Sequence, residues 1–235
     1  QCTEMTYHVL EKAIEERFSI RAFGYLPKLP DCALESRHLG LVTAAEITDL
    51  KEKLQIMAQQ AEKTIDLEGI LALAKQALPV TYEQILLPKR KPVRIAVARD
   101  KAFCFYYEDS LEALKDMGAE LVDFSPLHDK ALPENIHGLY VGGGYPELYA
   151  EKLSENLMMR QSIAEKLKQG TPCIAECGGF MYLTQAIGND PMTGSLEGIC
   201  FNREKLTRFG YVTLKAKRDN LLCKAGEEIA AHEFH

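Results

Sequence analysis

One short stretch restricts the fold of this chain more than any other. Residues 171–183 read TPCIAECGGFMYL, an apolar run that ends abruptly at Cys177 before two glycines and a series of helix-forming residues. This pattern predicts a buried strand, a sharp turn and the start of a helix, with a thiol at the turn. Segment 175–179 has the form G-x-C-x-G, except that alanine holds the first position, and so matches the cysteine version of a nucleophile elbow.

Each part of the predicted elbow suits a reactive thiol. The small residues around Cys177 allow a strained turn that exposes the side chain, and the following helix N-terminus favours thiolate over thiol. The N–H group of Gly178 would then face the oxyanion formed on attack. The alternative is a structural cysteine before an ordinary turn, because free cysteine commonly behaves as a small hydrophobic residue. The glycine pair and a second glycine run at 142–144 favour catalysis.

Composition excludes several classes of protein. The 235 residues are 46% hydrophobic and 26% charged, as in a soluble globular protein of one large or two small domains. A net charge of −6, with no basic run longer than 89–91, argues against a nucleic-acid-binding surface. No apolar run is long enough to span a membrane and no signal peptide is visible, so we expect a cytoplasmic protein without a membrane partner. The seven cysteines are scattered without a C-x-x-C motif, which favours reduced thiols over disulfides or a metal site.

The order of predicted elements indicates two parts. Before residue 79, helices are expected at 3–16, 44–59 and 67–77, with a strand-like run at 18–26. A proline-rich, charged stretch at 79–92 is typical of a linker. From Val93 onward, near-continuous apolar strands (93–98, 120–124, 138–141 and the run into Cys177) alternate with helices (110–117, 146–153 and 157–168), and a strand is expected at 209–214.

Alternating strands and helices of this kind predict an α/β fold with a doubly wound, mostly parallel sheet. Ligand sites in such sheets lie at the carboxyl ends of the strands. Three predicted loops emerge there, at 99–109, 142–147 and 177–179. The glycines at 142–144 could supply the second half of an oxyanion hole. Among the six histidines, His232 and His235 follow the elbow in the chain order usual for a Cys…His pair.

The motifs together resemble the cobyrinate a,c-diamide synthase family, glutamine-dependent enzymes of corrinoid (cobalamin) biosynthesis. The resemblance covers nearly the whole chain. Its main motifs are GGGYPE at 142–147, AECGGFMYL at 175–183 and HEFH at 232–235, and AFCFYYEDSL at 102–111, FSPL at 124–127 and SRHLGL at 36–41 also match.

This resemblance implies that two parts of the chain have different functions. Residues 93–235 would form a class I glutamine amidotransferase domain with a flavodoxin-like sheet, and 81–92 a linker. Residues 1–80 would be the C-terminal part of an ATP-dependent, P-loop-type α/β synthetase domain whose P-loop half is absent, with Arg37 and His38 as accessory contacts or solvated loop residues. ATP and Mg²⁺ belong to the complete enzyme, and neither is expected to bind this chain alone. Glutamine and the corrinoid cobyrinate are the implied partners, and a homo-oligomer remains open.

The implied reaction assigns roles to named residues. Cys177 attacks the side-chain amide of glutamine, Gly178 with Gly143 or Gly144 holds the oxyanion, and a histidine relays the proton. His235 is preferred over His232, because the single histidine of the related cobyric acid synthases aligns with the last position of the motif. The glutamate that usually follows this histidine by two positions has no counterpart, because the sequence stops at residue 235. A Cys–His dyad is therefore expected.

The loop at 99–109 supplies the candidates for contact with the macrocycle. Lys101, Phe105, Tyr106 and Tyr107 combine a cation with aromatic faces, which suit an apolar ring with carboxylate arms. The alternative places the aromatic residues in the core. Three other functions also remain open: the same chemistry on another tetrapyrrole such as nickel sirohydrochlorin, a cysteine hydrolase on a flavodoxin-like sheet, and a binding module in which Cys177 is only structural.

Overall fold

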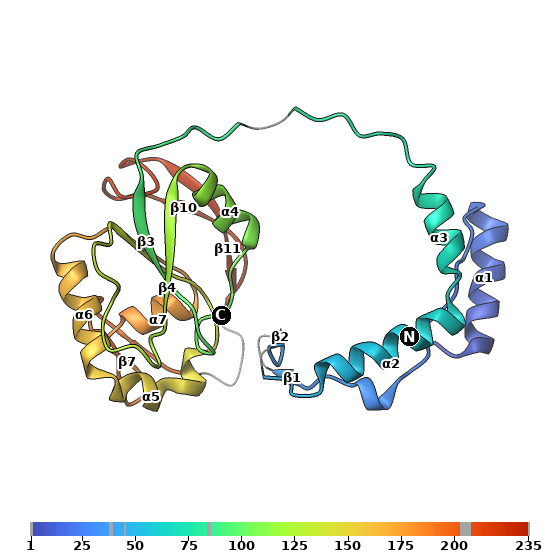
Figure 1. Cartoon of the computed structure of the whole chain (residues 1–235), viewed down its shortest axis with the longest axis horizontal. Coiled ribbons are helices and arrows are strands. Elements are labelled where there is room, and N and C mark those ends of the chain that lie inside the picture. The colour runs from blue at the N-terminus through green and yellow to red at the C-terminus, as the bar shows by residue number, and fades with distance from the viewer. Residues whose placement is uncertain (1, 38–39, 45, 84–85, 203–207, 235) are drawn as a thin grey trace. The chain divides into compact units, whose positions relative to one another are not determined.

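The chain divides into two compact units, residues 1–84 (unit 1) and 85–235 (unit 2), each of which is described by itself (Figure 1). The structure is a computed structural model, and it describes residues 2–37, 40–44, 46–83, 86–202 and 208–234. Within these ranges, no helix is both long and apolar enough to cross a membrane.

A four-stranded parallel sheet forms the centre of unit 2. Its strands are β3 (Val93–Ala98), β4 (Ala119–Phe124), β5 (Gly138–Val141) and β6 (Cys173–Ala175), in the spatial order β4-β3-β5-β6. The prediction of a mostly parallel sheet is confirmed. From β3 the chain adds β4 on one side and then returns to add β5 on the other. The carboxyl ends of β3 and β5 therefore flank the point where the strand order reverses, which is where ligands bind in open α/β sheets.

Helices follow the strands of this sheet (Figure 1). The predicted start of the first helix in unit 2 is wrong. This helix begins at Glu108 rather than at residue 110, and its N-cap, Tyr107, makes no side-chain cap hydrogen bond. The predicted helix at 157–168 is confirmed, and Asn156 caps it by accepting a hydrogen bond from the N–H of Met159 at 3.3 Å. The elements are α4 (Glu108–Asp116), η2 (Pro146–Tyr149), α5 (Ala150–Glu155), α6 (Leu157–Lys168) and α7 (Gly178–Leu183).

The hydrophobic core lies between the sheet and these helices. Ala96, Ala98 and Val141 are fully buried on the strands, and Met159 and Ile163 are fully buried on α6. Full burial of a side chain the size of Val141, Met159 or Ile163 stabilises the fold by about 1.5–3 kcal/mol. The ends of β5 and β6, which the glycine motifs follow, are therefore anchored in a well-packed core.

Tyr182 of α7 is fully buried in this core, with its ring tilted against Phe103 at 5.3 Å between centroids. Burial raises the pKa of its hydroxyl, for which no hydrogen-bond partner is found among the described residues. Because an unsatisfied buried hydroxyl is unfavourable, Tyr182→Phe should leave the free energy of unfolding unchanged or raise it by about 1 kcal/mol. Urea unfolding of the whole chain measures this, and a clear loss of stability would contradict the expectation.

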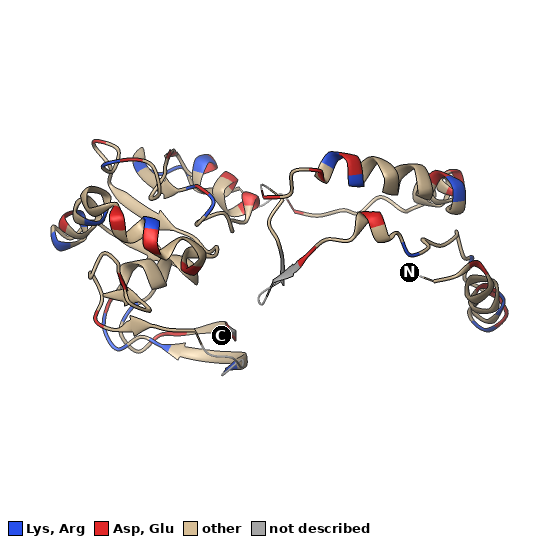
Figure 2. Cartoon of the chain, turned by 90° about the horizontal axis from the view of Figure 1, so that it is seen from below, with Lys and Arg blue, Asp and Glu red and all other residues tan. Residues whose placement is uncertain are grey.

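Two smaller sheets complete unit 2. Strands β7 (Ala186–Ile187), β8 (Asp190–Pro191) and β9 (Ile199–Cys200) form one of them. The other is an antiparallel pair, β10 (Phe209–Lys215) and β11 (Glu228–Phe234), which Figure 2 shows apart from the central sheet. The predicted strand at 209–214 is confirmed. Lys and Arg are mixed with Asp and Glu over both units (Figure 2).

Unit 1 is built mainly of helices. The prediction of a strand at 18–26 is wrong, because the first helix continues to Phe18 and Ser19 ends it with φ 51°. Within that run only Gly24 makes a β-bridge, to Ile65. The helix expected at 44–59 is shifted to 50–64. The elements are α1 (Glu4–Phe18), η1 (Pro30–Cys32), β1 (Ser36–Arg37), β2 (Gly40–Leu41), α2 (Leu50–Thr64) and α3 (Leu67–Ala74).

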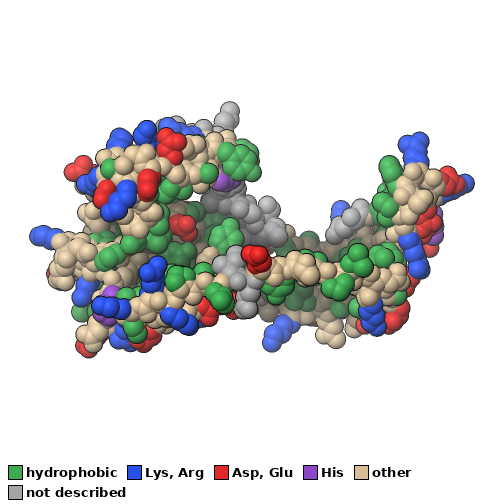
Figure 3. Space-filling model, turned by 90° about the horizontal axis from the view of Figure 1, so that it is seen from above, with side chains coloured by type: hydrophobic (Ala, Val, Ile, Leu, Met, Phe, Trp, Pro, Cys, Tyr) green, Lys and Arg blue, Asp and Glu red, His purple; other side chains and the backbone are tan. Residues whose placement is uncertain are grey.

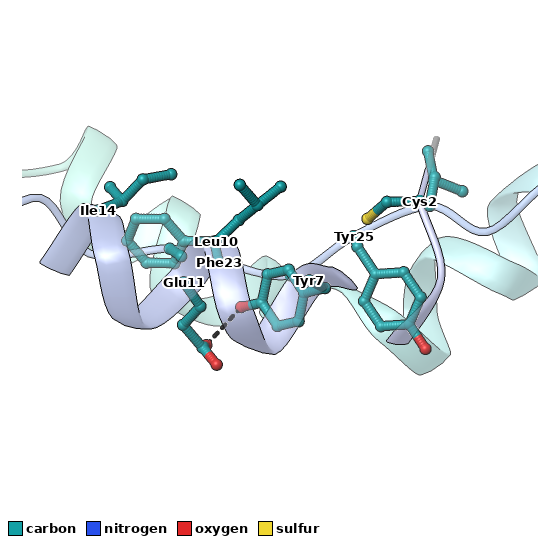
Figure 4. Close-up of a pocket in the computed structure, with 10 residues that line it drawn as sticks. Cys2, Tyr7, Leu10, Glu11, Ile14, Phe23 and Tyr25 are labelled. Carbon is teal, nitrogen blue, oxygen red and sulfur yellow. Dashed lines mark hydrogen bonds between the residues drawn. The ribbon is translucent and has the colours of Figure 1, made fainter. Parts of the chain in front are cut away.

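Unit 1 buries very little of its apolar surface. In its described part, Cys32 is the only buried residue, and α1, α2 and α3 have none. Figure 3 shows hydrophobic side chains spread along this unit. A hollow of about 290 Å³ lies between α1 and the segment 22–26. Figure 4 shows Tyr7 on its wall, where a 2.6 Å hydrogen bond to Glu11 raises the pKa of Tyr7 to about 12.

Candidate active site

Cys177 lies at the apex of a strained turn between β6 and α7. Its backbone has φ 49° and ψ −114°, a conformation that non-glycine residues rarely adopt. Such a conformation costs of order 1–3 kcal/mol and persists only where the surrounding packing imposes it. The side chain is nevertheless exposed. A strained turn that presents an exposed thiol is the geometry of a nucleophile elbow.

The glycines after Cys177 are required by close packing of α7 on the end of β5. A Cβ added at Gly179 would lie 2.0 Å from the carbonyl oxygen of Val141, and one at Gly178 would lie 2.6 Å from Cδ of Pro146. Any side chain at either position would push the helix off the strand end. Because Gly178 and Gly179 have no side chains, the elbow can pack directly against the glycine run that follows β5.

This packing leads to a test by substitution. Gly179→Ala should lower the free energy of unfolding by about 1–3 kcal/mol, because the added methyl group overlaps rigid backbone. Gly138→Ala is the matched control: it lies on β5 itself, and its added Cβ would meet nothing closer than 3.7 Å. Urea unfolding of both variants gives the comparison. Equal losses at the two positions would show that the close packing is not a constraint.

Two backbone N–H groups without a described acceptor lie near the thiol. Gly144 and Gly178 are both buried, and among the described residues no acceptor is found for their N–H groups, whereas Gly143 is paired with Phe105 in an antiparallel bridge. A Cβ built on Gly143 would lie 3.4 Å from Cβ of Cys177, and one on Gly178 would lie 3.3 Å from the nitrogen of Gly144. Buried N–H groups are normally paired, so these two are available to a ligand. Donors beside a thiol can stabilise a negatively charged oxygen as it forms.

The candidate residues of the loop after β3 lie in different environments. Phe105 and Tyr106 lie against the glycine run: the N–H of Phe105 donates to the carbonyl of Gly143 at 3.0 Å, and the Tyr106 hydroxyl accepts from the N–H of Gly142 at 2.9 Å. Phe105 remains 43% exposed, and Lys101 and Tyr107 are exposed. Phe103, from the same cluster of aromatic residues, is fully buried in the core.

Two other residues near the elbow were not singled out from the sequence. Tyr140, on β5, donates a 3.4 Å hydrogen bond to Glu176, the residue before Cys177. Burial, together with the charge of Glu176, raises the pKa of Tyr140. Cys173, on β6, differs sharply from Cys177, because burial raises the pKa of its thiol to about 11. Only the exposed cysteine of this segment is therefore suited to react near neutral pH.

The candidate bases lie on or beyond β11. His232 faces Tyr211 in the register of the hairpin, and its ring contacts those of Phe209 and Tyr211, each at 5.5 Å between centroids. Glu233 forms an ion pair with Arg208 at 3.2 Å. His235 and His38 lie outside the described residues. Within the described ranges, no group of three or more His, Cys, Asp or Glu side chains is arranged to hold a metal ion.

Comparison with known protein families gives one match that covers most of unit 2. A model described as a CobB/CobQ-like glutamine amidotransferase domain matches residues 94–235. A search of solved structures finds PurLQS from Thermotoga maritima, with a TM-score of 0.44 and 19% identity, covering 61% of this chain and 66% of that one. A structural likeness this slight supports no inference.

Curated proteins match over nearly the whole chain. The cobyrinate a,c-diamide synthases of Clostridium tetani and Caldanaerobacter subterraneus subsp. tengcongensis are each 44% identical to it, over 99% of this chain and 53% of their own length. That of Dehalococcoides mccartyi strain ATCC BAA-2266 is 42% identical over 97% of this chain and 52% of its own. The chain thus spans about half the length of the curated relatives it matches.

Proposed function

The chain belongs to the CobB/CobQ-like glutamine amidotransferase family, and we propose that it supplies the glutaminase part of an ATP-driven ligase that amidates the a and c carboxylates of cobyrinate. The similarity to cobyrinate a,c-diamide synthases supports the choice of substrate. One structural observation carries the proposal: an exposed thiol at a strained turn lies beside buried N–H groups that have no acceptor among the described residues. Glutaminases need this combination to cleave an amide.

The proposed cleavage proceeds through a thioester. The sulfur of Cys177 attacks the side-chain amide carbon of glutamine, a C–S bond forms, and negative charge collects on the carbonyl oxygen. The N–H groups of Gly178 and Gly144 hold that oxygen. His235 takes the proton of the thiol and transfers it to the amide nitrogen, the carbonyl re-forms, the C–N bond breaks, and ammonia leaves. Water then hydrolyses the thioester to glutamate and restores the thiol.

Ammonia can amidate a carboxylate only after that carboxylate is activated. In the complete enzyme, ATP and Mg²⁺ would supply the activation as an acyl phosphate. Residues 1–80 contain no glycine-rich phosphate loop followed by Lys and Ser or Thr. This part of the chain therefore does not fit a nucleotide site on its own, and its residues are assigned no step with ATP. ATP, glutamine and the free cysteines together favour the cytoplasm.

Covalent labelling by a glutamine-mimicking diazo-ketone tests the glutaminase role directly. The reagent should modify Cys177 alone, at a rate that free glutamine slows, and peptide mass spectrometry identifies the site. Cys173 is the internal control, because its half-buried thiol, with its pKa raised to about 11, should stay unmodified. Labelling without protection by glutamine would indicate a cysteine hydrolase of another class. Absence of labelling would leave Cys177 a structural residue and reject the proposal.

A further inference from the structure

The side chain of Tyr106 connects the ends of two central strands. Its hydroxyl donates a hydrogen bond to the carbonyl of Ala98, the last residue of β3. The same oxygen accepts a hydrogen bond from the N–H of Gly142, the residue that follows β5, at 2.9 Å. Because β3 and β5 flank the reversal of strand order, this one hydroxyl crosses the point where ligands bind in such sheets.

Contacts on several sides fix the position of the Tyr106 ring. The ring of Tyr140 meets it edge-on at 5.2 Å between centroids, and the guanidinium of Arg99 lies 5.3 Å from its centroid. A Cβ added at Gly142 would lie 2.6 Å from the ring, so the glycine backbone packs directly on the aromatic surface. Burial raises the pKa of the hydroxyl, which keeps it protonated and able to donate and accept at once.

The residues held by this hydroxyl lead directly into the candidate oxyanion donors. Gly142 is fixed through its N–H by Tyr106. Gly143 is fixed through its carbonyl, which accepts from the N–H groups of Cys104 and Phe105, each at 3.0 Å. Both anchors come from the loop after β3. The peptide groups of Gly143 and Gly144 are therefore oriented by that loop, and N–H donors stabilise an oxyanion only when they are held in the correct geometry beforehand.

We propose that Tyr106 is a positioning residue for glutamine cleavage, whose hydroxyl holds the 142–144 backbone so that the N–H of Gly144 can receive the oxyanion. This inference rests on the proposed glutaminase function. It gives Tyr106 a role in the glutamine site in place of contact with the macrocycle. It also explains the need for glycine at position 142, where the tyrosine ring leaves no room for a side chain.

Tyr106→Phe in the full-length enzyme tests the inference, because it removes only the hydroxyl. We expect kcat for glutamine hydrolysis to fall by roughly 10- to 100-fold, as for a misplaced donor group, while KM for glutamine changes by less than about 3-fold. The rate at which iodoacetamide alkylates Cys177 should stay near that of the wild type, because this reaction forms no oxyanion. Tyr182→Phe is the matched control: its hydroxyl has no hydrogen-bond partner among the described residues, and kcat should be retained.

The outcomes separate this inference from the function on which it rests. Glutamine hydrolysis by the wild-type enzyme establishes the function by itself. Given that activity, an unchanged kcat in Tyr106→Phe overturns the positioning role alone. Parallel losses of glutaminase and alkylation rates also overturn it, because they would show that the hydroxyl only maintains the fold of the elbow. A wild-type enzyme that does not hydrolyse glutamine rejects the proposed function, and the positioning role with it.

Discussion

Replacing Cys177 with alanine in the complete enzyme should abolish amidation with glutamine while leaving amidation with ammonium salts intact. The thiol is the only group at the elbow that can form the thioester, and removal of a nucleophile typically costs at least about 10³-fold in kcat. The ligase reaction needs only ammonia and an activated carboxylate. Free ammonia should therefore bypass the lost step.

The assay compares the two nitrogen donors with cobyrinate as acceptor, and with nickel sirohydrochlorin as the competing tetrapyrrole. Cys173→Ala is the matched control, because Cys173 lies on the adjoining strand with a half-buried thiol whose pKa is raised to about 11. It should retain both activities. Glutamine-dependent turnover in Cys177→Ala would mean that the nucleophile has been misassigned. Loss of both activities would mean that the substitution damages the whole protein.

Local sequence was sufficient to place the elbow and the strands of the central sheet. The apolar run before Cys177 and the glycines after it predicted a strand, a turn and a helix start, and β6, the strained Cys177 and α7 follow in that order. Short apolar runs between turn residues predicted β3 and β5 with their observed bounds. These features depend on neighbours in sequence, so a pattern can show them.

Contacts between distant segments were not predictable in this way. The predicted start of α4 was two residues too late. The helix begins directly after Tyr107, just beyond the bridge between Phe105 and Gly143, and the local sequence pattern does not show that bridge. The hydroxyl of Tyr106 bonds to strand ends on either side of it in sequence. Nothing in the motif FCFYYED distinguishes this tyrosine from the exposed Tyr107. Only the fold separates the two.

In unit 1 the sequence pattern failed to predict packing. Helical spacing correctly predicted α1 and α3 in outline, but it carries no information about what an apolar face packs against. The strand predicted at 18–26 was wrong, since apolar alternation forms a strand only when a partner edge is present, and one bridge at Gly24 is all that this run makes among the described residues. Burial in this unit could not be read from the sequence.

The choice between His232 and His235 gives the second large expected effect. His235→Ala should lower kcat for glutamine hydrolysis by roughly 10²–10⁴-fold, the usual contribution of general acid–base catalysis, because the amide nitrogen cannot leave without a proton. Position 235 is preferred from the resemblance to enzymes with a single histidine there. In the structure, the exposed side chain of His232 contacts the rings of Phe209 and Tyr211 within the hairpin.

The two roles predict different responses to matched substitutions. His232→Ala should lower the stability of the hairpin by about 0.5–1.5 kcal/mol through loss of ring contacts, and His232→Phe should restore it. Neither change should alter the pH dependence of kcat, whereas His235→Ala should remove the ionisation of the proton-transferring group from that profile. Steady-state kinetics from pH 5 to 9 and thermal unfolding of all three variants make the comparison. A larger loss of kcat at position 232, which phenylalanine does not rescue, would reverse the assignment and place the base on β11 itself.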